Sequence, residues 1–269
     1  MQQLHFIPGL PRSGSTLFSA LRAQTPRFDA GMSGPLAGLF GALLGEMSER
    51  SEFAAFLDDA KRQRVLRGVF DSYYADVDAP VIFDTSRGWC TRLPALAQLF
   101  PQAKVIACVR DLPWIFDSFE RQVRAHPFSP SALFNYSPSG TVYTRVNSLA
   151  GPEGQVGYPF DALKEACFGA HTAQLLLVQY ETLSSDPGKA LAAIYDFLGE
   201  SPHTHDFSDV RYEAEAFDRR LGLPTLHRVR GAVKAEPRAS LLPPDLFQRF
   251  AHDAFWRDPA RRPAGLRLV

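Results

Sequence analysis

A glycine-containing segment near the start of the chain, Gly9-Leu10-Pro11-Arg12-Ser13-Gly14-Ser15-Thr16, carries residue types that bind phosphate. Its glycines have the G-x-x-x-x-G spacing of a phosphate-binding loop, in which backbone N–H groups approach an anion closely. Ser15 stands where nucleoside triphosphatases have a lysine, and Arg12 places a permanent cation inside the loop. Ser13, Ser15 and Thr16 add hydroxyl donors. The segment predicts a site for a different phosphate-containing donor; a surface turn that caps a helix is the alternative.

A second candidate site follows the apolar run Val105–Val109. The run leads into Arg110-Asp111, and Ser118 comes eight residues after Arg110, within an expected helix. Ligands of open α/β sheets bind at the carboxyl ends of the strands, so Arg110 and Ser118 could hold a second phosphate away from the loop. Pairing of Arg110 with Asp111 or Asp117 is the alternative.

The elements that must position these residues alternate along the chain. Buried parallel strands are short apolar runs with polar carboxyl ends, and four runs are expected to be strands: Leu4–Pro8, Val81–Asp84, Val105–Val109 and Leu175–Gln179. Helices are expected over Thr16–Gln24, Phe53–Tyr74, Leu93–Phe100, Trp114–Val123, Ala162–His171 and Pro187–Leu198. The alternation predicts an α/β, three-layer fold with a central parallel β-sheet flanked by helices, of the P-loop-like nucleotide-binding kind.

The 269 residues are expected to form a single domain over residues 1–269. Within it, the segment 128–157 is rich in Ser, Pro, Gly and Tyr and is expected to be a long loop or lid that binds the acceptor. The apolar residues from Leu36 to Met47 have helical spacing, which is typical of core or of a pocket wall. The basic, proline-rich stretch Arg257–Arg267 is expected to be a solvated tail.

Composition limits the classes of function. Twenty-nine Lys and Arg residues balance 29 Asp and Glu residues, so no general attraction to nucleic acid or to an anionic membrane is expected. Three well-separated cysteines, Cys90, Cys108 and Cys167, fit neither a disulfide framework nor a zinc site, and no metal is expected. No apolar run is long enough to span a bilayer, and the first strand begins too early for a signal peptide. We therefore expect a cytoplasmic protein.

Four segments together resemble the sulfotransferases that use 3′-phosphoadenosine 5′-phosphosulfate (PAPS). Members of that family carry P-[KR]-[ST]-G-[ST]-[ST] after the first strand, here Pro11-Arg12-Ser13-Gly14-Ser15-Thr16, and a strand ending in R-D with a serine eight positions after the arginine, here Arg110 and Ser118. The stretch Tyr180-Glu181-Thr182-Leu183-Ser184-Ser185-Asp186-Pro187 resembles the family's Y-E-x-L-x-x-x-P signature. The stretch Leu226-His227-Arg228-Val229-Arg230-Gly231 resembles a late basic segment with glycine that many members have.

The resemblance implies a PAPS-dependent sulfotransferase that moves a sulfuryl group to a hydroxyl acceptor by in-line displacement and leaves adenosine 3′,5′-bisphosphate, with no metal required. The loop would bind the 5′-phosphosulfate, the Arg110–Ser118 pair the 3′-phosphate and Tyr180 the adenine. The donor-binding residues so implied are Pro11, Arg12, Ser13, Gly14, Ser15, Thr16, Leu17, Arg110, Ser118, Tyr180, Arg228, Arg230 and Gly231. Arg12 would stabilise charge on the leaving phosphate, and Ser118 could touch the bridging oxygen or only the 3′-phosphate.

The general base cannot be carried over, because the chain departs from the family pattern twice. Where animal enzymes that sulfate tyrosine have a glutamate, this chain has Met32 and Ser33, and where many members have a lysine it has Thr85, with Arg87 close enough to replace the charge. Asp84, which ends an expected strand at the ligand edge, is the leading catalytic base candidate; capping of the following turn is the alternative. Weaker base candidates are Glu46, Asp71, His126 and His227.

Two other functions stay open: a P-loop small-molecule kinase, which would require magnesium, and a non-catalytic nucleotide-binding module. The acceptor loops, 28–47 and 128–157, hold many apolar and aromatic residues and few charges. This composition favours an apolar or aromatic hydroxyl acceptor, such as a small molecule, a lipid or a tyrosine peptide, over a polyanionic sugar. Trp89 and Trp114 could stack on adenine or acceptor, or fill the core.

Overall fold

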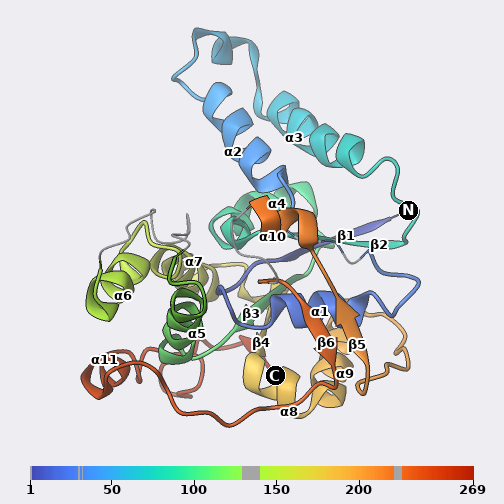
Figure 1. Cartoon of the computed structure of the whole chain (residues 1–269). Coiled ribbons are helices and arrows are strands. Elements are labelled where there is room, and N and C mark those ends of the chain that lie inside the picture. The colour runs from blue at the N-terminus through green and yellow to red at the C-terminus, as the bar shows by residue number, and fades with distance from the viewer. Residues whose placement is uncertain (1, 30, 32, 129–139, 221–225) are drawn as a thin grey trace.

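The structure is a computed structural model that describes residues 2–29, 31, 33–128, 140–220 and 226–269. A five-stranded parallel sheet forms its centre, in the order β2-β1-β3-β4-β7 (Figure 1). Its strands are β1 Gln3–Ile7, β2 Val81–Thr85, β3 Val105–Val109, β4 Leu175–Gln179 and β7 Arg267–Leu268. A separate antiparallel pair consists of β5 Val210–Tyr212 and β6 Val229–Gly231. The four strands expected from apolar runs are confirmed.

Helices cover both faces of the sheet, so the predicted three-layer α/β fold is confirmed (Figure 1). The α-helices are α1 Ser15–Arg22, α2 Leu36–Glu46, α3 Asp59–Tyr73, α4 Leu93–Leu99, α5 Leu112–Ala125, α6 Val142–Ala150, α7 Gly157–Phe168, α8 Tyr180–Ser185, α9 Pro187–Leu198, α10 Glu215–Arg220 and α11 Pro244–Arg249. Short 3₁₀ turns occur at Glu52–Phe56, Arg87–Arg92 and Thr172–Gln174. Among these helices, none is both long and apolar enough to cross a membrane.

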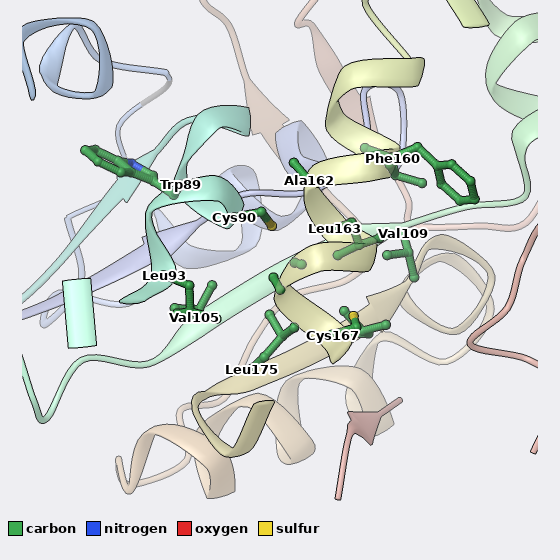
Figure 2. Packing of buried hydrophobic residues seen from close by; sticks show 14 of the residues in the cluster. Trp89, Cys90, Leu93, Val105, Val109, Phe160, Ala162, Leu163, Cys167 and Leu175 are labelled. Carbon is green, nitrogen blue, oxygen red and sulfur yellow. The ribbon is translucent and has the colours of Figure 1, made fainter. Parts of the chain in front are cut away.

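The central strands divide their side chains between two cores. In β3, Val105, Ala107 and Val109 pack on one face, while Ile106 and Cys108 pack on the other. Figure 2 shows the first core, where α7 lies across the sheet and its apolar side chains point toward β3 and β4. Because successive strand side chains point to opposite faces, a strand covered on both sides must be apolar throughout. That requirement explains why these strands could be recognised from short apolar runs.

Three expectations about the elements were wrong or incomplete. The single helix expected over Phe53–Tyr74 is broken, because Asp58 leaves the helical conformation and its carboxylate caps α3 by accepting from the Lys61 N–H at 2.7 Å. The loop expected over 128–157 contains α6, whose start is capped by Thr141 and whose residues Val146 and Leu149 are buried; residues 129–139 lie outside the described residues.

The third error concerns the C-terminal stretch. Most of Arg257–Arg267 is exposed, as a solvated tail would be, but Leu266 is buried and Arg267 begins β7, which pairs with β4. Near its start, Arg257 forms two ion pairs with acidic residues of the sheet edge. Pairing and burial of a two-residue strand depend on partners far away in the chain, so the local composition of this stretch did not predict the strand.

Candidate functional site

The carboxyl ends of β1, β2, β3 and β4 meet around a cavity of about 780 Å³. The loop after β1 forms one wall, and residues 85–87 at the end of β2, Arg110 after β3 and Tyr180 after β4 contribute others. Residues 226–238, here called the covering segment, close it from the side of β6. The covering segment is held at Asp117 of α5, a fully buried carboxylate that pairs with Arg238 at 2.8 Å and accepts from the Leu241 N–H at 2.7 Å.

The loop after β1 lies directly against β3. Gly9 has a φ of 127°, and a Cβ there would lie 2.4 Å from the Cys108 carbonyl oxygen, so only glycine permits this approach. Arg12 has a φ of 57°, a left-handed conformation that is strained for a residue with a side chain. Gly14, at a φ of 96°, forms the N-cap of α1. The loop therefore curls at the amino end of a helix, the geometry that favours anion binding.

Three hydrogen bonds made by Arg12 and Arg110 connect the predicted phosphate sites with each other and with the covering segment. Arg12 Nε donates to Ser118 Oγ at 3.0 Å, and an Arg12 terminal nitrogen donates to the Leu226 carbonyl at 3.0 Å. Arg110 donates to the Arg12 carbonyl at 3.3 Å, and its guanidinium carbon lies 4.0 Å from the centroid of the Tyr180 ring. The loop, the β3–α5 junction and the Y-E segment are thus brought into one cavity.

The alternative partners of Arg110 are taken by other cations. Asp111 pairs with Arg257 at 2.8 Å, and Asp117 pairs with Arg121 and Arg238. In addition, Arg110 Nε is buried and has no hydrogen-bond partner in the part of the chain that the structure describes. The same holds for the buried hydroxyl of Thr85 on the cavity wall. Both atoms belong to residues that line the cavity, and a buried polar group without a partner is uncommon in folded proteins.

The cavity concentrates positive charge at short range. Burial, followed by the nearby charge of Arg110, lowers the pKa of Arg12. Burial likewise lowers the pKa of Arg110, and burial together with Arg12 lowers the pKa of Arg87 to about 10. Each shift reports a desolvated cation among other cations, and a bound anion would relieve that cost. The arrangement suits a ligand with more than one anionic group.

Most of the predicted donor-binding residues line the cavity: Pro11, Arg12, Gly14, Ser15, Thr16, Leu17, Arg110, Ser118, Tyr180, Arg228 and Arg230. Ser13 does not line the cavity, because its buried hydroxyl is bonded to the Leu10 and Cys108 carbonyls and fastens the loop to β3. Gly231 lies beside the wall, in β6, at a φ of 88°. Arg228 and Arg230 line the cavity but both pair with Glu213.

Asp84, the leading base candidate, does not line the cavity. It is 1% exposed, and its two carboxylate oxygens accept from Tyr74 Oη and Trp89 Nε1, each at 2.6 Å. Burial raises the pKa of Asp84, and these two hydrogen bonds lower it. Both oxygens are engaged inside the core, so the geometry gives no support to proton abstraction in the cavity. Trp89 is a core residue, and Trp114 packs on Phe247.

Among the weaker candidates, His227 alone lines the cavity within the described residues; Glu46, Asp71 and His126 lie elsewhere. His227 Nδ1 lies 2.5 Å from Asp218 Oδ1, and the His227 backbone N–H donates to Asp218 Oδ2 at 2.9 Å. Asp218 is 2% exposed and was missed at the sequence level, since no motif links α10 to the covering segment. Ser33 and Arg87 also line the cavity, whereas Met32 lies outside the described residues.

The surroundings of His227 favour the neutral form of its ring. Burial lowers its pKa, Asp218 opposes that shift, and Arg12 and Arg87 lower the pKa further. With the Nδ1 proton directed to Asp218, the lone pair of the neutral ring is on Nε2. No group of three or more His, Cys, Asp or Glu side chains that could hold a metal occurs among the residues that the structure covers.

The fold and site define an α/β protein with a cavity at the carboxyl edge of a parallel sheet, lined by a cluster of arginines. The chain belongs to the sulfotransferase family, since the model described as "Sulfotransferase family" matches residues 5–205. The search of curated proteins found no match.

Solved structures with this fold include the sulfotransferase domain from the curacin biosynthetic pathway. It is 16% identical, with 76% of each chain covered and a TM-score of 0.50. A sulfotransferase from Alicyclobacillus acidocaldarius is 18% identical, with 82% of this chain and 89% of that chain covered and a TM-score of 0.46. The sulfotransferase domain of the Synechococcus PCC 7002 olefin synthase is 21% identical, with 75% of each chain covered and a TM-score of 0.44.

Proposed function

We propose that the protein is a sulfotransferase that uses PAPS as donor and a hydroxyl compound as acceptor. The observation that carries this proposal is the presence of two half-buried guanidinium groups, Arg12 and Arg110, in one cavity, where Arg110 donates to the Arg12 carbonyl and Arg12 donates to Ser118. A donor with anionic groups at its 5′ and 3′ positions matches two such cations. When bound, that donor supplies an activated sulfuryl group attached to a phosphate leaving group.

Arg12 is proposed to stabilise negative charge on the leaving phosphate. Two of its N–H groups are held by Ser118 and by the Leu226 carbonyl, which fix the guanidinium while other donors remain for an anion. The amino end of α1 adds its positive dipole on the same side. Fixed donors of this kind need no reorganisation during reaction, so they stabilise the transition state more than solvent does.

Arg110 is proposed to bind the 3′-phosphate, and Tyr180, on which Arg110 stacks, is proposed to contact the adenine. Ser118 positions Arg12 and can contact a phosphate oxygen as well. Arg228 and Arg230 are proposed as further phosphate ligands after release from Glu213. Arg87, on the wall near Arg12, is proposed to supply the charge that the lysine absent at Thr85 would provide.

His227 is proposed as the general base in place of Asp84. Its neutral ring lines the cavity, and Nε2 is the atom that would accept the acceptor's hydroxyl proton. Asp218 holds the opposite nitrogen, orients the ring and stabilises the imidazolium that forms. General base catalysis by a positioned side chain contributes about 10²–10⁴-fold in rate.

The acceptor is proposed to carry its hydroxyl on an apolar or aromatic frame. Phe217 and Leu226 line the cavity beside His227, and the Phe217 ring centroid lies 5.4 Å from that of the imidazole. Such a frame is found in a small phenol or alcohol, in a lipid and in a tyrosine peptide. Its burial against these side chains would favour binding by about 25 cal/mol per Å² of apolar surface.

The donor class is tested by calorimetric titration with adenosine 3′,5′-bisphosphate, compared with ADP and magnesium. Metal-independent binding of the bisphosphate in preference to ADP is expected. Preference for magnesium-ADP would favour a kinase and overturn the proposal.

The base is tested with His227→Ala, using His126→Ala, at the end of α5, as the matched control. We expect kcat to fall by about 10²–10⁴-fold in His227→Ala, with bisphosphate affinity retained, and no change in the control. Equal kcat in both variants would remove His227 from the mechanism. Bisphosphate binding without turnover of any hydroxyl compound would indicate a binding module.

A further inference from the structure

Arg257 connects the ends of two strands that carry the donor site. Its Nε lies 2.8 Å from Asp111 Oδ1, and one of its terminal nitrogens lies 2.9 Å from Glu181 Oε2. Asp111 directly follows Arg110, and Glu181 directly follows Tyr180. One guanidinium thus binds the neighbours of both members of the Arg110–Tyr180 stack. Arg257 lies beyond residues 5–205, the segment that matches the family.

The two carboxylates are potential competitors for Arg110. Burial raises the pKa of Asp111 and of Glu181, and in each case the charges of Arg257 and Arg110 lower it again. Both carboxylates are therefore close enough to Arg110 to attract it. In the structure Arg110 instead stacks on Tyr180 and donates to the Arg12 carbonyl. Its Nε has no hydrogen-bond partner within the described residues.

The backbone of Arg257 is fixed by its neighbours in the chain. Trp256 is fully buried in the core that contains β3, and the Arg257 backbone N–H donates to the Ala254 carbonyl at 3.0 Å. The Arg257 side chain reaches the sheet edge from this anchor, with 41% of its surface exposed. The two ion pairs use different nitrogens of Arg257, Nε and a terminal nitrogen, which the planar guanidinium holds at a fixed separation.

We propose that Arg257 is a positioning residue of the donor site: by occupying Asp111 and Glu181, it leaves Arg110 free to stack on Tyr180 and to bind an anion in the cavity. The inference rests on the proposed function, in which that anion is the donor's 3′-phosphate. Without Arg257, two carboxylates that have lost their partner would draw Arg110 away from the cavity. The loss should be confined to ligands that carry a 3′-phosphate.

The test uses the full chain and two ligands, adenosine 3′,5′-bisphosphate and adenosine 5′-phosphate, titrated by calorimetry. In Arg257→Ala we expect the Kd of the bisphosphate to rise by about 10- to 100-fold and that of the 5′-phosphate by less than about threefold. Arg257→Lys, which keeps one ion pair, should show an intermediate rise. Arg261→Ala, an exposed change four residues away, serves as the matched control and should change neither Kd.

The decisive variant combines Arg257→Ala with Asp111→Asn and Glu181→Gln. Because no carboxylate is left to capture Arg110, the bisphosphate Kd should return to within about threefold of the wild-type value. A purely structural role for Arg257 predicts no such recovery and equal weakening of both ligands. If Arg257→Ala fails to fold, the other two variants still test the inference. The inference is wrong if the triple variant does not bind the bisphosphate with nearly wild-type affinity, or if Arg257→Lys does not weaken binding of the bisphosphate more than binding of the 5′-phosphate.

The controls also separate this inference from the proposed function. Wild-type protein that does not bind the bisphosphate would overturn the proposed function itself. Wild-type binding combined with unchanged affinity in Arg257→Ala would overturn only the role of Arg257.

Discussion

Replacement of Ser118 by alanine tests how the two anion sites are coupled. Ser118 is 6% exposed, and its hydroxyl accepts from Arg12 Nε at 3.0 Å. The backbone of Arg12 is in the left-handed region. Its side-chain hydrogen bonds to Ser118 and to the Leu226 carbonyl hold the guanidinium in position. A hydrogen bond to a charged group contributes about 1.5–3 kcal/mol when buried. Loss of that amount corresponds to an increase of about 10- to 100-fold in the Kd of adenosine 3′,5′-bisphosphate.

The assay is a double-mutant cycle measured by calorimetry with the bisphosphate. If Ser118 acts by holding Arg12, Ser118→Ala should cost little further affinity once Arg12→Met has been made, and the coupling energy should be about 1.5–3 kcal/mol. Ser184→Ala is the matched control, because Ser184 is also buried at the cavity but its hydroxyl donates to the Glu181 carbonyl of its own helix. Additive losses would refute the reasoning, since they would mean that Ser118 and Arg12 bind the ligand independently.

Two further predictions concern stability. Burial and then Lys104 lower the pKa of His5 to about 4, so protonation favours the unfolded chain, in which the ring titrates near 6.5. The contribution of His5 to the free energy of unfolding is therefore complete above pH 6.5 and falls by about 2.5 kcal/mol by pH 4.5. Urea unfolding at pH 7.5 and 4.5 should show this extra loss in the wild type but not in His5→Gln. Equal losses in the two proteins would contradict the prediction. Gly9→Ala should destabilise the protein by about 2–4 kcal/mol and weaken bisphosphate binding, because its Cβ would meet the Cys108 carbonyl. Gly199→Ala is the control, because Gly199 has a φ of 73° but open space around it, and it should cost about 1 kcal/mol in thermal unfolding and leave binding intact. Similar effects of Gly9→Ala and Gly199→Ala would argue against a close approach of the loop to β3.

The elements recognised from the sequence are those whose signal is local. A strand buried on both faces, such as Val105–Val109, must be apolar at every position, and a phosphate-binding loop must carry its glycines and donors within a few residues. By contrast, β5, β6 and β7 contain three, three and two residues, too few for a pattern to be visible. Their pairing depends on tertiary partners. The C-terminal stretch was misjudged for the same reason.

The site was predictable only where its residues belong to a motif. Arg12 lies in the loop after β1, Arg110 follows β3 and Ser118 lies in the helix after it, and the structure brings all three to one cavity. Asp84 is the last residue but one of β2, and strand alternation turns its side chain toward Trp89 and Tyr74 in the core, a choice of face that the sequence position alone does not reveal. The contact of Asp218 with His227 is created by the path of the chain through α10 and the covering segment.

The sheet also has a consequence for how the protein folds. Each neighbouring pair of strands joins residues at least seventy positions apart, as in Phe6 with Val105 or Leu176 with Arg267. Closing such large loops costs chain entropy before the paired strands contribute any stabilising contacts. Non-local topologies of this kind therefore fold slowly. During that delay the uniformly apolar strands are exposed and prone to aggregate. Low temperature and slow synthesis should therefore favour recovery of folded protein.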